Sequence, residues 1–230
     1  MRLRPFFSYY GSKWTIIDKY PKPNTDTIIE PFAGSAQYAT RYPSKKVILY
    51  DLDENIYQIW KYLICVSEKE IMDMDLNFDH IQESRLTQEQ KILVGFWIAQ
   101  GGASPAKTRT KRSIENGILW KERTCCQLQY IRHWEIYNTS YEQIEDHHAT
   151  WFIDPPYQNK GYCYRKSSKH INYPHLSQWC KERKKEYIVC ENNGADWMQF
   201  KDLCSLKNMR NAQTREVYCT NIMERQLYLW

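Results

Sequence analysis

Short apolar runs rich in β-branched residues alternate along this chain with segments in which apolar residues recur at helical spacing. Residues 27–31 and 46–51 are predicted strands, and residues 149–153 form another apolar stretch of the same kind. Residues 55–64, directly after the second strand, have the apolar spacing of a helix. Strands that alternate with helices predict an α/β fold with a mostly parallel, doubly wound sheet.

The last third of the chain continues this pattern. A charged helical segment at 176–185 precedes a predicted strand at 187–190. Residues 216–220 and 226–230 both favour strands, and their closeness in sequence predicts that they pair. The sheet is therefore expected to finish in a hairpin.

Between residues 66 and 134 the alternation of strands and helices is interrupted. Thr87 and Gln90 have the spacing of a capping box at the start of a helix that runs to Ile98. A Gly-Gly pair at 101–102 is expected to end that helix. This part of the chain is predicted to be an insertion in the α/β core.

A polar, basic loop follows, and a second inserted helix is predicted at about 122–134. With 230 residues, 42% hydrophobic and 26% charged, the chain has the length and composition of one globular domain rather than two. We therefore predict a single domain over residues 1–230, in which residues 66–134 form a mainly helical insertion.

Charge and aromatic content permit a nucleic acid partner without requiring one. The formal net charge is +5 and the isoelectric point is about 8.6, below the value above ~9 that is typical of a strongly basic nucleic-acid-binding domain. The 18 tyrosines and 9 tryptophans could stack on bases or fill the core. Composition alone therefore does not identify the partner.

Cysteine usage and the start of the chain bear on the compartment. The eight cysteines include no Cys-x-x-Cys pair and lie in apolar or helical contexts, which favours buried, reduced thiols over disulfides or a metal site. The first residues lack the apolar core of a signal peptide, and no run approaches the ~18 apolar residues of a membrane span. We expect a soluble cytoplasmic protein that needs no metal.

The tetrapeptide Asp154-Pro155-Pro156-Tyr157 follows the strand predicted at 149–153. A carboxylate after a buried strand lies where open α/β sheets bind ligands. The prolines fix φ and remove two N–H donors, so the turn presents rigid carbonyl acceptors. The carboxylate and a proline carbonyl could bind the two hydrogens of an exocyclic amine while the tyrosine stacks on its ring. The alternative is an ordinary Asp-Pro turn that leaves a core strand.

Small residues at 32–36 follow the first strand, where a turn is expected to open a helix. Gly34 lets the chain approach a ligand closely, but neither a Walker loop nor a G-x-G-x-x-G fingerprint is present, which favours a ligand without a pyrophosphate. Asp51 ends the second strand at a spacing typical of an acid that binds ribose hydroxyls. Tyr9 could cover a nucleoside or amino-acid ligand, and Lys13 could pair with a carboxylate.

Taken in order, the Tyr-Tyr-Gly-Ser-Lys segment at 9–13, the small-residue turn, the acid and the Asp-Pro-Pro-Tyr turn resemble the Dam-like DNA adenine-N6 methyltransferases, in particular compact members carried by bacteriophages. The resemblance extends from residue 9 to residue 218. It implies a Rossmann-like class I methyltransferase fold and S-adenosylmethionine as the cofactor. By resemblance, the cofactor-binding residues are Tyr9, Lys13, Phe32, Gly34, Asp51 and Asp154.

Two places depart from the family's pattern. The small-residue turn commonly has a second glycine where Ser35 or Ala36 stands. Many relatives have an acid and an aromatic residue where Ser140 and Tyr141 stand. We therefore expect a slightly different fit around the cofactor, and the contact with its adenine stays open.

The resemblance implies methyl transfer to N6 of an adenine that is flipped out of DNA. Asp154 and the Pro155 carbonyl would bind the amine hydrogens and free the nitrogen lone pair, and Tyr157 would stack on the base. Together with Pro156 these residues form the expected catalytic turn. The short helical insertion, which has no obvious reading hairpin, predicts a short or degenerate target. The expected DNA-binding residues are Lys107, Arg109, Lys111, Arg112, Lys121 and Arg123.

Alternatives to this function remain open at this point: the same chemistry on RNA, methylation of cytosine N4, or a catalytically silent DNA-binding relative. Asp154 favours adenine, because serine is more usual at this position of cytosine enzymes. The presence of both the acid and the cofactor motif argues against a silent relative. The oligomeric state and the target sequence are not defined.

Overall fold

The structure is a computed structural model that describes residues 2–99, 101–207 and 213–223. These residues form a seven-stranded mixed sheet with the strand order β3-β2-β1-β4-β5-β7-β6. Strands β1 to β5 pair in parallel, and β7 is antiparallel to both β5 and β6. The predicted Rossmann-like, mostly parallel sheet is therefore confirmed. The strands are β1 (Thr27–Glu30), β2 (Lys46–Tyr50), β3 (Glu135–Tyr137), β4 (Thr150–Ile153), β5 (Glu186–Asn192), β6 (Lys201–Lys207) and β7 (Gln213–Thr220).

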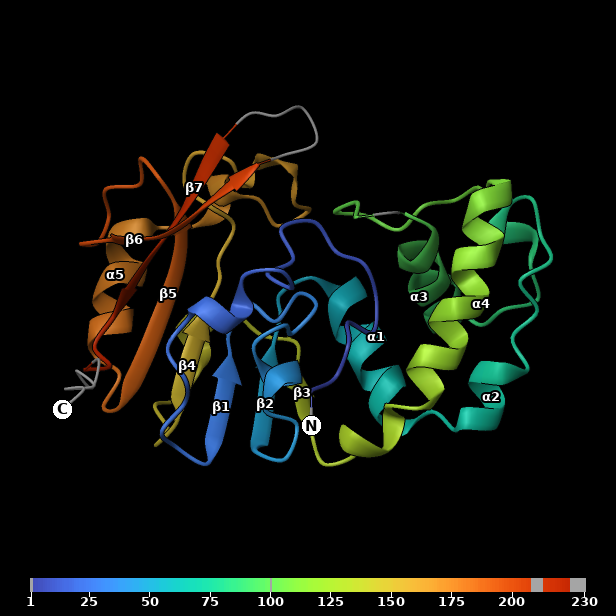
Figure 1. Ribbon diagram of the computed structural model, residues 1–230, viewed down its shortest axis with the longest axis horizontal. Coiled ribbons are helices and arrows are strands. Elements are labelled where there is room, and N and C mark those ends of the chain that lie inside the picture. Colours follow the sequence, from blue (N-terminus) through green and yellow to red (C-terminus); the bar gives the residue numbers. More distant parts are fainter. Residues whose placement is uncertain (1, 100, 208–212, 224–230) are drawn as a thin grey trace, which may run out of the picture.

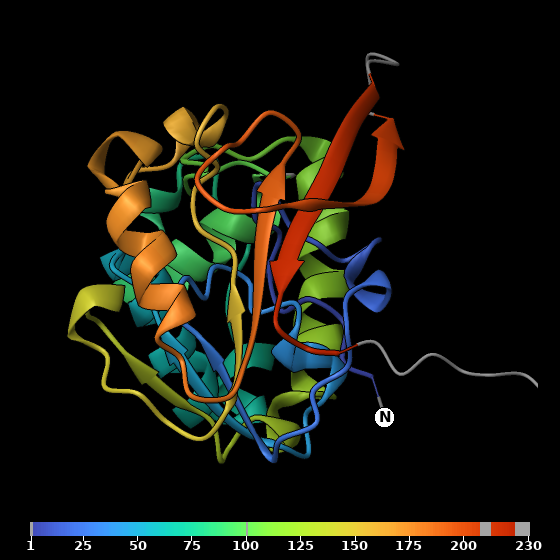
Figure 2. The ribbon, with the colours of Figure 1, turned by 90° about the vertical axis from the view of Figure 1, so that its left-hand side faces the viewer.

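Alternate residues of the central strands enter two different cores. Ile28 and Phe152 face one apolar cluster, and their neighbours Ile29 and Trp151 face another, as the two-residue period of a strand requires. The first cluster continues into α1 and α3, whereas α5 packs in the second. Figures 1 and 2 show α5 beside β5, with α1 to α4 gathered toward the other end of the sheet. The helices are α1 (Glu54–Cys65), α2 (Glu68–Met72), α3 (Gln88–Ile98), α4 (Lys111–Cys125) and α5 (Tyr173–Lys181).

Helix α1 is held between the sheet and the other helices. The Asp53 side chain caps it by accepting the N–H of Asn55 at 3.0 Å, which satisfies one of the free donors of the first turn. The apolar residues Ile56, Ile59, Trp60 and Leu63 are fully buried. This apolar stripe packs α1 against the core, and the helix begins shortly after the acidic end of β2.

The middle of the chain contains α2, α3 and α4, and one of these helices lies elsewhere than predicted. The capping box of Thr87 and Gln90 is present and α3 extends to Ile98. The helix predicted at 122–134 is wrong, because α4 begins at Lys111 and ends at Cys125. Gly117 lowers the helix propensity of this segment, so the sequence does not indicate a helix there. In the structure a Cβ at Gly117 would lie 2.9 Å from the Leu76 side chain, so the helix packs closely at this point.

The segment after β1 also differs from expectation. No α-helix follows the small-residue turn; instead the chain makes a short 3₁₀ turn at Ala39–Arg41. Pro43 disfavours helical φ and ψ at Tyr42, whose backbone is already extended in φ at −130°. The turn is therefore a compact loop rather than the entry to a long helix.

The end of the sheet was only partly predicted. Both edges of β7 are occupied, by β5 and by β6, so its hairpin partner is the unpredicted strand β6. The second strand of the expected hairpin, at 226–230, lies outside the described residues. Strand β3 was also not predicted, and α5 begins at Tyr173 because Asn172 caps it and Pro174 occupies its first turn.

Two further expectations concern the whole chain. Within the described ranges, none of the helices has the length and apolar character needed to cross a membrane. All eight cysteines are free thiols. Their expected burial is wrong for Cys65, Cys126 and Cys163, which are exposed.

Candidate functional site

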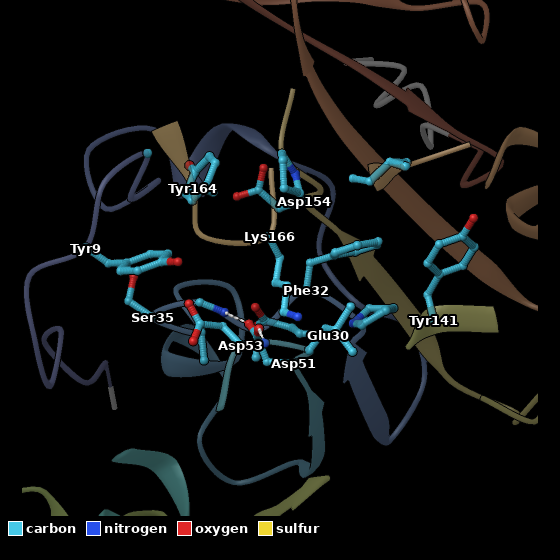
Figure 3. Close-up of a pocket in the computed structure, with 18 of the residues that line it drawn as sticks. Tyr9, Glu30, Phe32, Ser35, Asp51, Asp53, Tyr141, Asp154, Tyr164 and Lys166 are labelled. Atoms are coloured by element: carbon cyan, nitrogen blue, oxygen red, sulfur yellow. Dashed lines mark hydrogen bonds between the residues drawn. The ribbon is translucent and has the colours of Figure 1, made fainter. Parts of the chain in front are cut away.

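A pocket opens at the carboxyl ends of β1, β2 and β4. The strand order reverses between β1 and β4, and ligands of open α/β sheets bind at such a switch point. The cavity has a volume of about 320 Å³ and is drawn in Figure 3. Its lining comprises residues 9–13, 30–37, 51–53 and 139–142, together with Phe152, Asp154, Pro156, Tyr164, Lys166, Ser167, His170 and Ile171.

Asp51 organises the floor of this pocket. Its carboxylate accepts the N–H groups of Gly34 at 2.9 Å and of Asp53 at 2.8 Å. Burial raises the pKa of Asp51 to about 7, although these two hydrogen bonds oppose the shift. The acid thus joins the end of β2 to the turn after β1 and still faces the pocket (Figure 3).

The turn at Gly34 requires a residue without a side chain. Its φ is +46°, and a Cβ would lie 3.2 Å from two carbons of the Tyr9 ring. Its carbonyl accepts the indole N–H of Trp60 at 2.8 Å. Ala36, in the same turn, also has a positive φ, of 47°, a conformation that glycine adopts more readily. Ala36 therefore holds a backbone conformation that is strained for a residue with a side chain.

Asp154 and Lys13 meet at the opposite wall. Lys13 Nζ lies 2.9 Å from Asp154 Oδ2 and 3.8 Å from Glu216 Oε1. Burial raises the pKa of Asp154 above its usual value, and the Lys13 ammonium opposes that rise. Burial alone would lower the pKa of Lys13, but the two carboxylates raise it. Lys13 is therefore a buried cation, paired within the protein.

The proline turn is fixed from behind. The Pro156 carbonyl accepts the Tyr173 hydroxyl at 2.7 Å, and a Cβ on Gly161 would lie 2.7 Å from the Pro156 carbonyl carbon. Tyr157 donates its hydroxyl to Glu216 Oε1. These contacts hold the turn rigid, as its two prolines predict.

Aromatic side chains border the pocket on two sides. Tyr9 packs edge-on against Phe96 of α3, with ring centroids 5.6 Å apart, so one wall is continuous with the helical region. Phe32 and Tyr141 lie 5.6 Å apart at the other side, and Figure 3 shows Tyr9 and Tyr141 at opposite ends of the pocket. Such flat apolar walls suit a planar ring.

Sequence reasoning missed two groups of residues near the pocket. Tyr164, Lys166 and His170 line it from the segment that follows the Asp-Pro-Pro-Tyr turn, where an aromatic and basic run was the available signal. Glu216 was also missed, although an acid at the start of a predicted strand, followed directly by Val217 and Tyr218, is a sign of a buried charge. Its side chain is 7% exposed.

The six residues expected to bind DNA lie in the helical region, away from the lining of the pocket. Arg109 bonds to the Leu76 carbonyl at 3.1 Å, and Lys121 bonds to the Met74 carbonyl at 2.8 Å. Arg123 lies over the Trp120 ring at 4.8 Å. Lys107 is exposed. Lys111 and Arg112 begin α4, and their side chains lie outside the described part of the structure.

All of the expected cofactor residues, by contrast, converge. Tyr9, Lys13, Phe32, Gly34, Asp51 and Asp154 line one cavity although they come from four separate segments. Pro156 lines it as well, while Pro155 is buried and Tyr157 is half-buried beside it. The departing positions Ser140 and Tyr141 also face the pocket.

Comparison with known proteins supports the resemblance. Residues 9–91 match the family model of the D12 class N6 adenine-specific DNA methyltransferases. That range includes Tyr9, Lys13, Gly34 and Asp51 and extends into α3. A search of curated proteins finds no match. The matched motifs surround the switch point of a mostly parallel sheet, and this part of the chain is therefore similar to the D12 class of N6 adenine-specific DNA methyltransferases.

Proposed function

We propose that the pocket binds S-adenosylmethionine and that Asp154 holds the N6 amine of the target adenine. The observation that carries this proposal is the position of Asp154, after β4 and across one cavity from Asp51 and Gly34. The carboxylate proposed to bind the amine and the residues proposed to bind the cofactor therefore line the same cavity. The family's reaction, methylation of adenine in DNA, needs these two subsites to adjoin.

The residues present fit the cofactor in three parts. Phe32 and Tyr141 would contact the adenine ring, and Asp51 would bind the ribose hydroxyls. Gly34 keeps the turn free of a side chain, since a Cβ would lie 3.2 Å from the Tyr9 ring that lines the same pocket. Lys13 lies at the Asp154 end, so its contact would be with the amino-acid part of the cofactor rather than with the nucleoside.

Asp154 would act on the acceptor nitrogen. The lone pair of an adenine amine is delocalised into the ring, which makes the nitrogen a poor nucleophile. Hydrogen bonds from the amine to Asp154 and to the Pro155 carbonyl favour a pyramidal nitrogen and hold it in place. When bound, the cofactor supplies an electrophilic sulfonium methyl group, so positioning contributes most of the rate acceleration.

The target base must leave the duplex to reach Asp154. Tyr157 adjoins Asp154 and is fixed through its hydroxyl, which supports a role as the stacking ring for the flipped base. DNA would then cross the open side of the pocket, within reach of the helical region at 66–134, which we propose as the target-recognition part of a single methyltransferase domain.

Contacts to phosphate would come from that region. Lys107 is exposed and is the strongest candidate whose side chain the structure describes. Three of the expected residues already contact protein groups, so their role would include supporting the helices: Arg109, Lys121 and Arg123. Lys111 and Arg112 remain proposed contacts to DNA. Binding through phosphates makes the affinity fall steeply with salt. The enzyme would work in the cytoplasm of a bacterial or phage-infected cell.

Cofactor binding is expected to depend on the charge of Asp51. Its pKa of about 7 means that the ionised form, the stronger acceptor for ribose hydroxyls, is lost as the pH falls. The dissociation constant for S-adenosylmethionine should therefore rise between about pH 8 and about pH 6, toward a limit of about tenfold per pH unit. Calorimetric titration in buffers of different ionisation enthalpy should detect proton release on binding.

Asp51→Asn is the matched control for this titration. It should bind the cofactor more weakly and without the pH dependence. A wild-type dissociation constant that stays constant over this pH range would exclude Asp51 as an ionised ribose ligand.

The target is proposed to be short or degenerate. We expect sequencing of DNA exposed to the enzyme to find methylated adenines in several related contexts of few base pairs. One uniform motif of about six or more base pairs would contradict this, because such a motif needs many base-edge contacts.

A further inference from the structure

Glu216 of β7 contacts three side chains that come from distant parts of the sequence. Its Oε1 accepts the hydroxyls of Tyr157 and of Tyr20, the latter at 2.9 Å. Lys13 Nζ lies 3.8 Å from the same oxygen. The carboxylate thus joins the antiparallel end of the sheet to the proline turn and to the N-terminal segment.

Such an acid is costly unless it is satisfied. The side chains of Glu216 and Lys13 are both 7% exposed, and an unpaired charge at that depth would be strongly unfavourable. Glu216 does not line the cofactor pocket. Its partners Lys13 and Tyr157 both lie beside Asp154, which Lys13 contacts at 2.9 Å. Glu216 is therefore linked to the surroundings of Asp154 through Lys13 and Tyr157.

Two of these contacts restrict the same ring. The Tyr157 hydroxyl is tied to Glu216, and Lys13 Nζ lies 4.8 Å from the centre of the Tyr157 ring. An aromatic ring that is held at its hydroxyl and covered by a cation has little freedom to turn. The plane on which a flipped base can stack is thereby set before the base arrives.

We propose that Glu216 is a positioning residue for methyl transfer, which holds the Tyr157 ring and the Lys13 ammonium in place beside Asp154. This inference rests on the proposed roles of Asp154 and Tyr157. Glu216 itself touches neither the base nor the cofactor. It acts through the two side chains that it binds.

Glu216 also acts electrostatically on Asp154. Burial raises the pKa of Asp154, Lys13 opposes the rise, and the like charge of Glu216 adds to it. Replacing Glu216 with glutamine removes that like charge and leaves Lys13 to pair with Asp154 alone. Both changes lower the pKa of Asp154, so its carboxyl should titrate at lower pH in the variant.

The first experiment is a double-mutant cycle with Glu216→Gln and Tyr157→Phe, measured as kcat on unmethylated plasmid DNA at saturating S-adenosylmethionine. Each single variant should lose about tenfold or more in kcat, the size expected for a buried hydrogen bond to a charged group. The double variant should lose little more than Tyr157→Phe alone, because glutamine only weakens the hydrogen bond that Tyr157→Phe removes. The dissociation constant for S-adenosylmethionine should stay at the wild-type value. Fully additive losses would overturn the positioning role.

The second experiment does not depend on activity. Carboxyl ¹³C resonances of the ligand-free protein are titrated, and Asp154 is assigned from the spectrum of Asp154→Asn. In Glu216→Gln the Asp154 titration should move to lower pH, whereas the exposed strand variant Asp202→Asn should leave it in place. An unmoved Asp154 titration in Glu216→Gln overturns the inference.

These two measurements distinguish a failure of the proposed role of Asp154 from a failure of the proposed role of Glu216. If the Asp154 titration moves and the cycle is non-additive, but Asp154→Asn retains wild-type turnover, the proposed role of Asp154 fails and the network itself stands. If Glu216→Gln does not fold, Tyr157→Phe breaks the same hydrogen bond while keeping the charge of Glu216. Its kcat must then fall with unchanged cofactor affinity, and wild-type turnover would overturn the inference.

Discussion

Replacing Asp154 with alanine is expected to abolish methyl transfer, a loss of at least about 10³-fold, while S-adenosylmethionine binding remains measurable. In the proposed mechanism the carboxylate is the acceptor that orients the adenine amine, and the methyl donor cannot compensate for a nitrogen held in the wrong place. The floor of the pocket, at Gly34 and Asp51, is built by other segments and should survive. Turnover on DNA and calorimetric cofactor binding are the two measurements.

The same change removes the nearest partner of Lys13, so folding must be checked. Thermal unfolding of Asp154→Ala and Asp154→Asn shows whether the buried lysine, left with Glu216 at 3.8 Å, destabilises the protein. Glu182→Ala, at an exposed acid after α5, is the control with wild-type turnover expected. A folded Asp154→Ala protein with near-wild-type turnover would refute the assigned role.

Replacing Gly34 with valine is expected to reduce cofactor affinity by at least about 100-fold, because a branched side chain at this positive φ both strains the turn and meets the Tyr9 ring. A Cβ alone would lie 3.2 Å from that ring. The Gly34 N–H would also leave its bond to Asp51. Equilibrium titration with S-adenosylmethionine measures the loss.

Gly194→Val is the matched control for backbone strain. Gly194 has a φ of +100°, but the nearest atom to its Cβ position is 3.6 Å away and belongs to a flexible side chain. Both variants should lose stability, and only Gly34→Val should lose the cofactor; Gly34→Ala serves if valine prevents folding. Equal cofactor affinity in the two folded valine variants would show that the turn at Gly34 is not part of the binding site.

The local motifs made much of the pocket predictable. Gly34, Asp51 and Asp154 each follow a strand that is recognisable from its apolar run, and parallel strands bring their carboxyl ends to one edge. Phe32 belongs to the same turn as Gly34. Three segments that are far apart in sequence could therefore be assigned to one edge of the sheet, whereas Tyr9 and Lys13 were assigned to the site by resemblance alone.

Other features depend on contacts that no local pattern encodes. Glu216 reaches Tyr20 across 196 positions of sequence, and its role as a shared acceptor emerges only when β7 enters the sheet beside β5. Helix α4 packs closely against Leu76 at Gly117, a contact between segments that are far apart in sequence. The basic residues at Arg109 and Lys121 looked like free charges, yet they bind backbone carbonyls that connect the helices.

The most direct test of the account uses the wild-type protein with labelled S-adenosylmethionine and unmethylated DNA, with RNA in a parallel reaction. The products are digested to nucleosides and the labelled species is identified. We expect the label in N6-methyl-2′-deoxyadenosine from the DNA reaction. Label in N4-methyl-2′-deoxycytidine, label only in the RNA reaction, or no transfer by a protein that binds the cofactor would contradict it.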